Sequence, residues 1–82
     1  EDESIIENKT FINGNGLLYD YYENGNIFSI SNYKNGSLEG EYEEYHINGK
    51  ISKRGKYLSN SKKGEWLEFS KRGLLKKNIK YD

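Results

Sequence analysis

The chain has 82 residues, a net charge of zero and 33% hydrophobic residues, and its aromatic residues are eight Tyr, three Phe and one Trp. A chain of this length forms one small domain and buries only roughly 60% of its unfolded surface. Disordered chains are poor in aromatic residues, so this composition indicates a folded chain with a thin core of rings. The absence of cysteine excludes a disulfide framework and a thiolate metal site. No apolar run approaches the roughly 20 residues of a membrane-spanning helix.

The charges are unevenly distributed between the two halves of the chain. Residues 1–45 carry ten acidic residues against two lysines, whereas residues 46–82 carry eleven lysines and arginines against three acidic residues. This asymmetry either steers a charged partner, favours head-to-tail contacts or only solubilises the surface. The abundance of Lys, Asn, Ile and Tyr without Ala or Pro is typical of an AT-rich genome and indicates a bacterial source. Two compartments stay open: the cytoplasm, or an exported location if a signal segment was removed before Glu1.

Runs of strand-forming residues between turn signals predict seven strands and no helix. In chain order the strands are expected near residues 4–12, 17–23, 26–34, 41–46, 50–58, 65–70 and 74–81. Sequential strands joined by short turns pair with their neighbours. The predicted fold class is therefore all-β: a single-layer twisted antiparallel meander of about seven strands.

Two kinds of turn connect these strands. Asn24-Gly25 and Asn48-Gly49 lie between strand-forming runs, and Asn-Gly favours a type I′ turn, in which both central residues have positive φ. Arg72-Gly73 occupies the corresponding place near the C-terminus, which predicts a weaker or differently shaped turn. The second kind of turn is expected at residues 35–37 and 59–63.

The sequence repeats itself every 24 residues. We expect one domain, 1–82, with a partial lead-in copy at 4–15 and copies at about 16–39, 40–63 and 64–82, each a β-hairpin unit. Two of the repeated positions are glycines with a structural role in turns: Gly16, Gly40 and Gly64, and then Gly25, Gly49 and Gly73. Four more are apolar or aromatic: Leu18, Tyr42 and Trp66; Tyr21, Tyr45 and Phe69; Ile27, Ile51 and Leu75; Tyr33, Tyr57 and Tyr81.

The alternation of side chains predicts which face of the sheet forms the core. Ile27, Ser29, Ser31 and Tyr33 share one face, and so do Ile51 and Tyr57 in the next copy and Leu75, Ile79 and Tyr81 in the last. In the first strand of each copy the rings are three residues apart, as in Leu18 and Tyr21. Either a bulge brings such a pair to one face, or both faces carry rings and one set is exposed.

These residues resemble the MORN-repeat variant family of bacteria. The similarity covers residues 11 to 81 and is closest at 40–51, where Gly-Glu-Tyr-Glu-Glu-Tyr-His-Ile-Asn-Gly-Lys-Ile follows the family's unit almost position by position. Residues 33–40 and 64–69 match it as well. The third copy departs from the pattern at Arg72-Gly73, and the first is shortened before Gly16. The resemblance implies a scaffold of β-hairpins.

The resemblance also implies several functions. Many bacterial relatives carry an antitoxin label, others resemble surface or secreted proteins, and MORN repeats elsewhere associate with phospholipids and accompany phosphatidylinositol-phosphate kinases. We reject a kinase activity for this chain, because it has no room for a kinase lobe and no glycine-rich phosphate loop followed by a helix.

Catalytic and metal chemistry finds little support in the sequence. His46 is the single histidine, and one histidine without cysteine makes no zinc site. The acidic residues Glu39, Glu41, Glu43 and Glu44 lack the spacing of a calcium loop and indicate a solvated strand face. Gly14-Asn15-Gly16 lacks the third glycine and the helix of a dinucleotide fingerprint. We therefore expect no enzyme, no cofactor and no metal.

The basic C-terminal half suggests two further partners. Lysines among rings are typical of single-strand nucleic-acid binding, but lysine exceeds arginine and the domain is not basic, so we do not expect nucleic acid. Anionic lipid headgroups are the alternative ligand of the same lysines.

The first hypothesis is a non-catalytic scaffold for protein–protein interaction, of an antitoxin type or a cell-surface type. Large rings are favoured interface anchors, and open sheet edges allow strand addition or self-association. The candidate binding residues are those whose type is aromatic or varies between copies: Tyr42, Tyr45, Trp66, Phe69, Lys53 and Lys77. The partner protein itself is not identified by the sequence.

Overall fold

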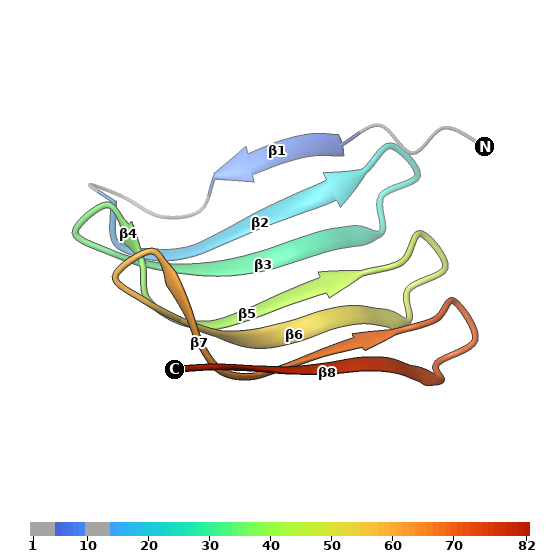
Figure 1. Ribbon diagram of the computed structural model, residues 1–82. Coiled ribbons are helices and arrows are strands. Elements are labelled where there is room, and N and C mark those ends of the chain that lie inside the picture. Colours follow the sequence, from blue (N-terminus) through green and yellow to red (C-terminus); the bar gives the residue numbers. More distant parts are fainter. Residues whose placement is uncertain (1–4, 10–13) are drawn as a thin grey trace.

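A computed structural model of the chain describes residues 5–9 and 14–82. These residues form one open antiparallel sheet (Figure 1), as expected. The strands are β1 (Ile5–Lys9), β2 (Gly16–Tyr22), β3 (Ile27–Lys34), β4 (Ser37–Leu38), β5 (Gly40–Tyr45), β6 (Ile51–Leu58), β7 (Ser61–Phe69) and β8 (Leu75–Tyr81). Their order in space is β1-β2-β3-β5-β6-β7-β8, and the two-residue β4 pairs with β3. The remainder of the expected strand 4–12, and with it part of the lead-in copy, lies outside the described residues.

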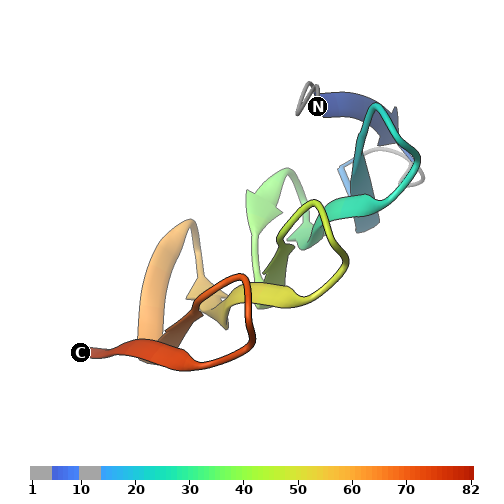
Figure 2. The ribbon, with the colours of Figure 1, turned by 90° about the vertical axis from the view of Figure 1, so that its right-hand side faces the viewer.

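The sheet is thin and built as a stack of hairpins. The molecule measures 35 × 30 × 12 Å, so the sheet is a single layer. Seen from the side of the hairpin turns, the successive units descend like steps, and β4 and the first part of β7 rise away from them (Figure 2). The strand contacts among the described residues join neighbours in this stack.

The three turns between first and second strands share one geometry, which differs from the expected type I′. In the first, the amide of Tyr22 donates to the carbonyl of Asn26, and the amide of Gly25 donates to the carbonyl of Tyr22. Gly25 has a φ of 93°, whereas Asn24 is not among the described residues of positive φ. The loop is therefore a three-residue connection in which one glycine takes the left-handed conformation.

The expectation of a different third turn was also wrong. Gly73 has a φ of 89°, and Ser70 makes the same two backbone bonds, to Leu74 and from Gly73, that close the first turn. Arg72 fits because the position before the glycine needs no positive φ here. The asparagine of the first two copies is thus not a requirement of the turn.

Type I′ geometry occurs instead in the turns at the other ends of the strands, after β3 and after β6. Asn35 and Gly36 have φ values of 52° and 83°, and Ser59 and Asn60 have values of 48° and 69°. The second of these turns is tight, because Leu58 pairs with Ser61. For this reason β7 begins at Ser61, four residues before its expected start at 65. In the preceding copy the same stretch is divided into β4 and β5.

A bulge at the start of each second strand recurs every 24 residues. Tyr21 pairs with Ile27 while Asp20 pairs with Ser29, so the extra residue is Phe28, and the same shift recurs at Tyr45 and at Phe69. The bulge does not bring Leu18 and Tyr21 to one face. Tyr21 stacks with Tyr19, with ring centroids 6.5 Å apart, whereas Leu18 is buried on the other side. Both faces of the sheet therefore carry rings.

The core lies on one face, which we call the core face. Its centre is Trp66, with 2% of its surface exposed, surrounded by the rings of Tyr42, Tyr57 and Tyr81 at centroid distances of 5.9, 5.0 and 6.4 Å. These contacts confirm the expected placement of Tyr57 and Tyr81 on the core side. The same expectation was wrong for Ile27, Ile51 and Leu75, because the bulge turns them to the other face, where they pair with Tyr21, Tyr45 and Phe69. Leu18 and Tyr22 are buried nearer the N-terminus.

Gly55 makes room for this cluster. It lies opposite Tyr42 in the β5–β6 pair, and a Cβ atom built on it would overlap the indole of Trp66. Trp66 also donates from Nε1 to the carbonyl of Lys56 at 3.1 Å. The absence of a side chain at Gly55 thus allows the indole to lie against the backbone of β6.

Candidate functional site

A row of polar side chains crosses the core face beside the aromatic cluster. Strand pairing places Asp20 opposite Ser29 and Glu44 opposite both Ser29 and Lys53. Glu68 in turn lies opposite Lys53 and Lys77. Cross-strand partners share a face, so acidic and basic groups alternate over the C-terminal part of this row.

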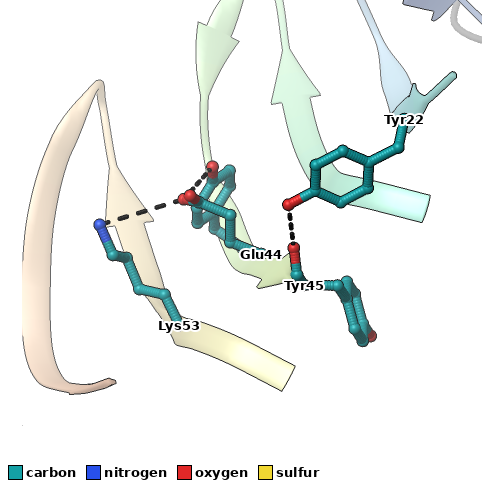
Figure 3. A network of polar contacts seen from close by, with 5 residues as sticks. Tyr22, Glu44, Tyr45 and Lys53 are labelled. Atoms are coloured by element: carbon teal, nitrogen blue, oxygen red, sulfur yellow. Dashed lines mark hydrogen bonds and ion pairs between the residues drawn. The ribbon is translucent and has the colours of Figure 1, made fainter. Parts of the chain in front are cut away.

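Glu44 is the best-connected member of the row (Figure 3). Its carboxylate accepts a hydrogen bond from the Tyr42 hydroxyl at 2.9 Å and lies 4.0 Å from Lys53 Nζ. Burial and the nearby Glu44 charge raise the pKa of Tyr42 well above its usual range. Burial, with a smaller contribution from Glu44, also raises the pKa of Tyr57. Both hydroxyls therefore keep their protons to a higher pH than an ordinary tyrosine does.

The structure divides the six candidate binding residues between the two faces. Tyr42, Trp66, Lys53 and Lys77 belong to the core face, the first two in the ring cluster and the lysines in the polar row. Tyr45 and Phe69 lie on the opposite face. Trp66 is buried within the chain, and Lys62 Nζ covers its ring at 4.9 Å from the centroid. Trp66 therefore holds the core together.

The opposite face, which we call the second face, carries a separate set of rings. Tyr19, Tyr21, Tyr45 and Phe69 are all half-buried. Tyr45 donates to the Glu43 carboxylate at 2.7 Å, and burial together with this bond raises the pKa of Tyr45 to about 12. These rings are arranged along the sheet on the side away from Trp66, so they are not needed to cover it.

A hollow opens on the second face where β5, β6 and β7 bend. Its volume is about 400 Å³. Acidic and basic groups face each other across its strands, since Glu43 pairs with Arg54 and Glu41 pairs with Lys56. The lining also contains Lys63, Glu65, Leu67, Tyr42 and the two glycines Gly55 and Gly64. Such a mixed lining suits a peptide or protein surface with both charges better than a uniformly charged ligand.

The glycines predicted to be structural lie in strained or crowded backbone. Gly16, Gly40 and Gly64 have φ values of 109°, 98° and 69° at the bends that start the first strands or, for Gly64, interrupt β7. A side chain at Gly40 would also contact Asn32. These positions support the fold and do not form part of the hollow, apart from Gly64.

His46 has a structural contact that the sequence did not indicate. Its Nε2 atom lies 2.8 Å from the carbonyl oxygen of Phe69, so Nε2 carries the proton and donates. Within the described part of the chain, no three side chains of His, Cys, Asp or Glu gather into a group that could hold a metal ion. The same residues contain no helix long and apolar enough to cross a membrane.

The acidic members of the polar row were missed by the sequence analysis, although a signal was present. Asp20, Glu44 and Glu68 are spaced by 24 residues, in step with the lysines Lys53 and Lys77 opposite them. A search for repeated charge, and not only for repeated apolar residues, would have found the row.

Comparisons of the sequence with protein-family models and with curated proteins, and of the structure with solved structures, give no match. The fold and the placement of the two faces are therefore the basis for assigning a function.

Proposed function

We propose that this protein is a non-catalytic β-hairpin repeat scaffold that binds a partner protein through its second face. The observation that carries the proposal is the set of rings on that face, which the core around Trp66 does not use. Half-buried tyrosines supply rigid contact area at low entropic cost and are frequent anchors of interfaces. The hollow beside them offers paired charges that fix the orientation of a partner.

Two further observations support a binding role without catalysis. His46, the single histidine of the sequence, is held by the backbone of the next hairpin. Burial and their glutamate neighbours also raise the pKa values of Tyr42 and Tyr45, so even less phenolate is available near neutral pH than from an ordinary tyrosine. Both features suit a fixed surface.

We further propose that the chain is a member of the MORN-repeat variant family, with a role of the antitoxin or the cell-surface type. The turns and bulges that recur at the 24-residue period support this assignment. The antitoxin role is tested by co-expressing the product of the neighbouring gene with and without this chain. Growth that is equal in both cases would remove that role while leaving the scaffold proposal intact.

The binding face is tested by photo-crosslinking in the native cell. A photoreactive phenylalanine analogue replaces Tyr45 or Phe69 in turn, and Tyr33, a half-buried ring on the core face of β3, serves as the control position. We expect one protein adduct of the same mass from both second-face positions and none from position 33. No adduct, or equal adducts at all three positions, would contradict the proposal.

A second candidate function is attachment to an anionic membrane surface. The last hairpin turn exposes Leu74 and Leu75 to 62% and 57% among the basic residues Lys71, Arg72, Lys76 and Lys77. Leucines inside a ring of cations fit the interface of a charged bilayer. The test is co-sedimentation with vesicles of neutral lipid and of neutral plus anionic lipid. Binding to the anionic vesicles that is lost in Leu74→Ser would support this function, and no sedimentation would remove it.

A further inference from the structure

The last strand of the sheet, β8, differs from its counterparts in the earlier copies. β3 and β6 occupy the same place in the repeat and are paired on both sides, whereas β8 pairs with β7 alone within the described residues. Leu75 is 57% exposed, while Ile27 and Ile51, at the same position in the earlier copies, are half-buried. Within the described residues, β8 is thus paired along one edge, and its other edge is open to a further strand.

β5 pairs with this edge of β3, and β7 pairs with this edge of β6, so these two strands show which sequence can pair there. β5 reads Gly-Glu-Tyr-Glu-Glu-Tyr and β7 includes Gly-Glu-Trp-Leu-Glu-Phe, so both follow the pattern Gly-Glu-aromatic-x-Glu-aromatic. The second glutamate of each pattern lies opposite the preceding second strand, with Glu44 beside Ser29 and Glu68 beside Lys53. The second aromatic residue extends over the preceding hairpin turn, where Tyr45 and Ile27 line one small hollow.

The chemistry of β8 matches a strand of this pattern. Lys77 in β8 occupies the position that Lys53 occupies in β6. Lys53 faces Glu68 of the following strand, β7, and Lys77 would face a carboxylate of an added strand in the same way. Leu75 occupies the position of Ile27 and offers an apolar contact for a ring. Lys76 and Lys80 add positive charge, and β8 itself contains no acidic residue. A strand with a carboxylate beside Lys77 and a ring beside Leu75 would complete both contacts.

We propose that the edge of β8 binds an extended, acidic segment of a partner protein as an added antiparallel strand with the pattern Gly-x-aromatic-x-acid-aromatic. Backbone pairing supplies the binding energy, and the alternate side chains supply the specificity. The backbone edge of β8 and Lys77 on the core face are separate from the rings of the second face, whereas Leu75 lies on the second face beside Phe69. Loss of the effect at Lys77 therefore overturns the edge proposal and leaves the second-face proposal intact.

A second copy of the chain fits the edge less well. Two β8 edges would bring lysines opposite lysines, which destabilises a strand pair. In the sheet, β1 runs in the same direction as β8, because six antiparallel pairings separate them. A copy that continued the sheet in the same orientation would therefore pair in parallel with β8, unlike the internal interfaces.

The test uses a peptide with the sequence of residues 37–46, Ser-Leu-Glu-Gly-Glu-Tyr-Glu-Glu-Tyr-His, because this segment covers β3 within the protein. Fluorescence anisotropy measures its binding to the 82-residue chain, and a scrambled peptide of equal composition is the control. We expect the patterned peptide to bind at least about tenfold more tightly and to slow amide hydrogen exchange in β8. Equal binding of both peptides, or protection confined to other strands, would overturn the proposal.

Variants of the chain test the two side-chain contacts. We expect Lys77→Glu to weaken peptide binding by about threefold to tenfold and a peptide with lysine in place of Glu44 to restore it. Lys77→Gln should also weaken binding. Because it places no negative charge beside Glu68, it is less able than Lys77→Glu to unfold the protein, so a loss of binding in this variant reports on the contact itself. Leu75→Ser should also weaken binding, whereas Leu58→Ser, at an exposed leucine that ends β6, should not.

Two experimental outcomes would show that β8 does not bind an acidic strand of a partner protein. If charge reversal at Lys77 leaves the affinity unchanged, the edge does not recognise the acidic side chain and the proposal fails. If sedimentation shows a dimer whose formation protects β8 and excludes the peptide, the occupant is a second copy and the proposal of a partner strand is overturned.

Discussion

Tyr22 and His46 make the same contact one repeat apart. The Tyr22 hydroxyl donates to the carbonyl of Tyr45 at 2.8 Å (Figure 3), and His46 Nε2 donates to the carbonyl of Phe69 at 2.8 Å. Each acceptor lies 23 residues after its donor, in the following hairpin. Two different side chains therefore join one unit to the next in the same way.

This equivalence predicts that a tyrosine can replace His46. His46→Tyr should keep the free energy of unfolding close to that of the parent, because its hydroxyl can donate as that of Tyr22 does. His46→Phe keeps a ring but removes the donor and should cost about 1 kcal/mol. Urea denaturation followed by tryptophan fluorescence measures both. Equal stability of the two variants would show that the contact does not stabilise the stack.

Gly55→Ala should destabilise the protein by about 1–3 kcal/mol, because the new methyl group overlaps the indole of Trp66. Thermal and urea unfolding give the magnitude. The matched control is the double-mutant cycle with Trp66→Leu, in which the smaller side chain removes the overlap. The cost of the alanine should fall to a few tenths of a kcal/mol in that background. An unchanged cost would place the cause in the backbone of Gly55.

The third hairpin turn should depend on Gly73 and not on its neighbour. Gly73→Ala forces an L-residue into positive φ and should cost about 1–2 kcal/mol. Arg72→Asn, which restores the Asn-Gly pair of the other copies, should change stability by less than about 0.5 kcal/mol. A larger gain from Arg72→Asn would indicate that this turn prefers type I′ geometry after all.

Alkaline pH should unfold the protein through its tyrosines. Tyr42, Tyr45 and Tyr57 have pKa values raised above the ordinary 10.0, that of Tyr45 to about 12, so the folded state holds these protons more tightly than the unfolded state. Their contribution to stability is fully present below pH 10 and is lost as the pH rises through the folded pKa values. Denaturation at a series of pH values, with phenolate absorbance, measures the loss. The variant Tyr42→Phe/Tyr45→Phe should lose less, and an identical loss would assign the effect to other groups.

The 24-residue columns were sufficient to predict the sheet and its strand order. They did not predict the ring cluster around Trp66, because the face on which Trp66 lies was left open and its ring was expected among the binding residues. Turn type was not predictable from Asn-Gly alone, because the loop between Tyr22 and Asn26 has three residues and only Gly25 among them takes positive φ. The period left two alternatives for Leu18 and Tyr21, which are three residues apart: a bulge that brings both to one face, or rings on both faces. The structure shows the second alternative, because the extra residue of the bulge is Phe28 in β3 and not a residue between Leu18 and Tyr21.

The site was predicted less completely than the fold. Tyr45 and Phe69 are on a face that can meet a partner, while Trp66 is consumed by the core. The role of His46 could not be found as a repeated residue, because Tyr22, His46 and Ser70 share a position but not a chemical type. In the third copy Ser70 Oγ accepts hydrogen bonds within its own turn, from the amides of Arg72 and Leu74.

Because each hairpin contacts its neighbours in the stack, the stability of the protein is close to a sum of unit terms and junction terms. We expect such a chain to unfold from its ends, and the loss of the contacts between two hairpins to leave the contacts between the other hairpins intact. Duplicating residues 40–63 should add one step to the staircase without redesign of any contact, since the new junctions repeat those already present. Length is thus a property that evolution can change in this molecule by whole units, independently of the surface that each unit presents.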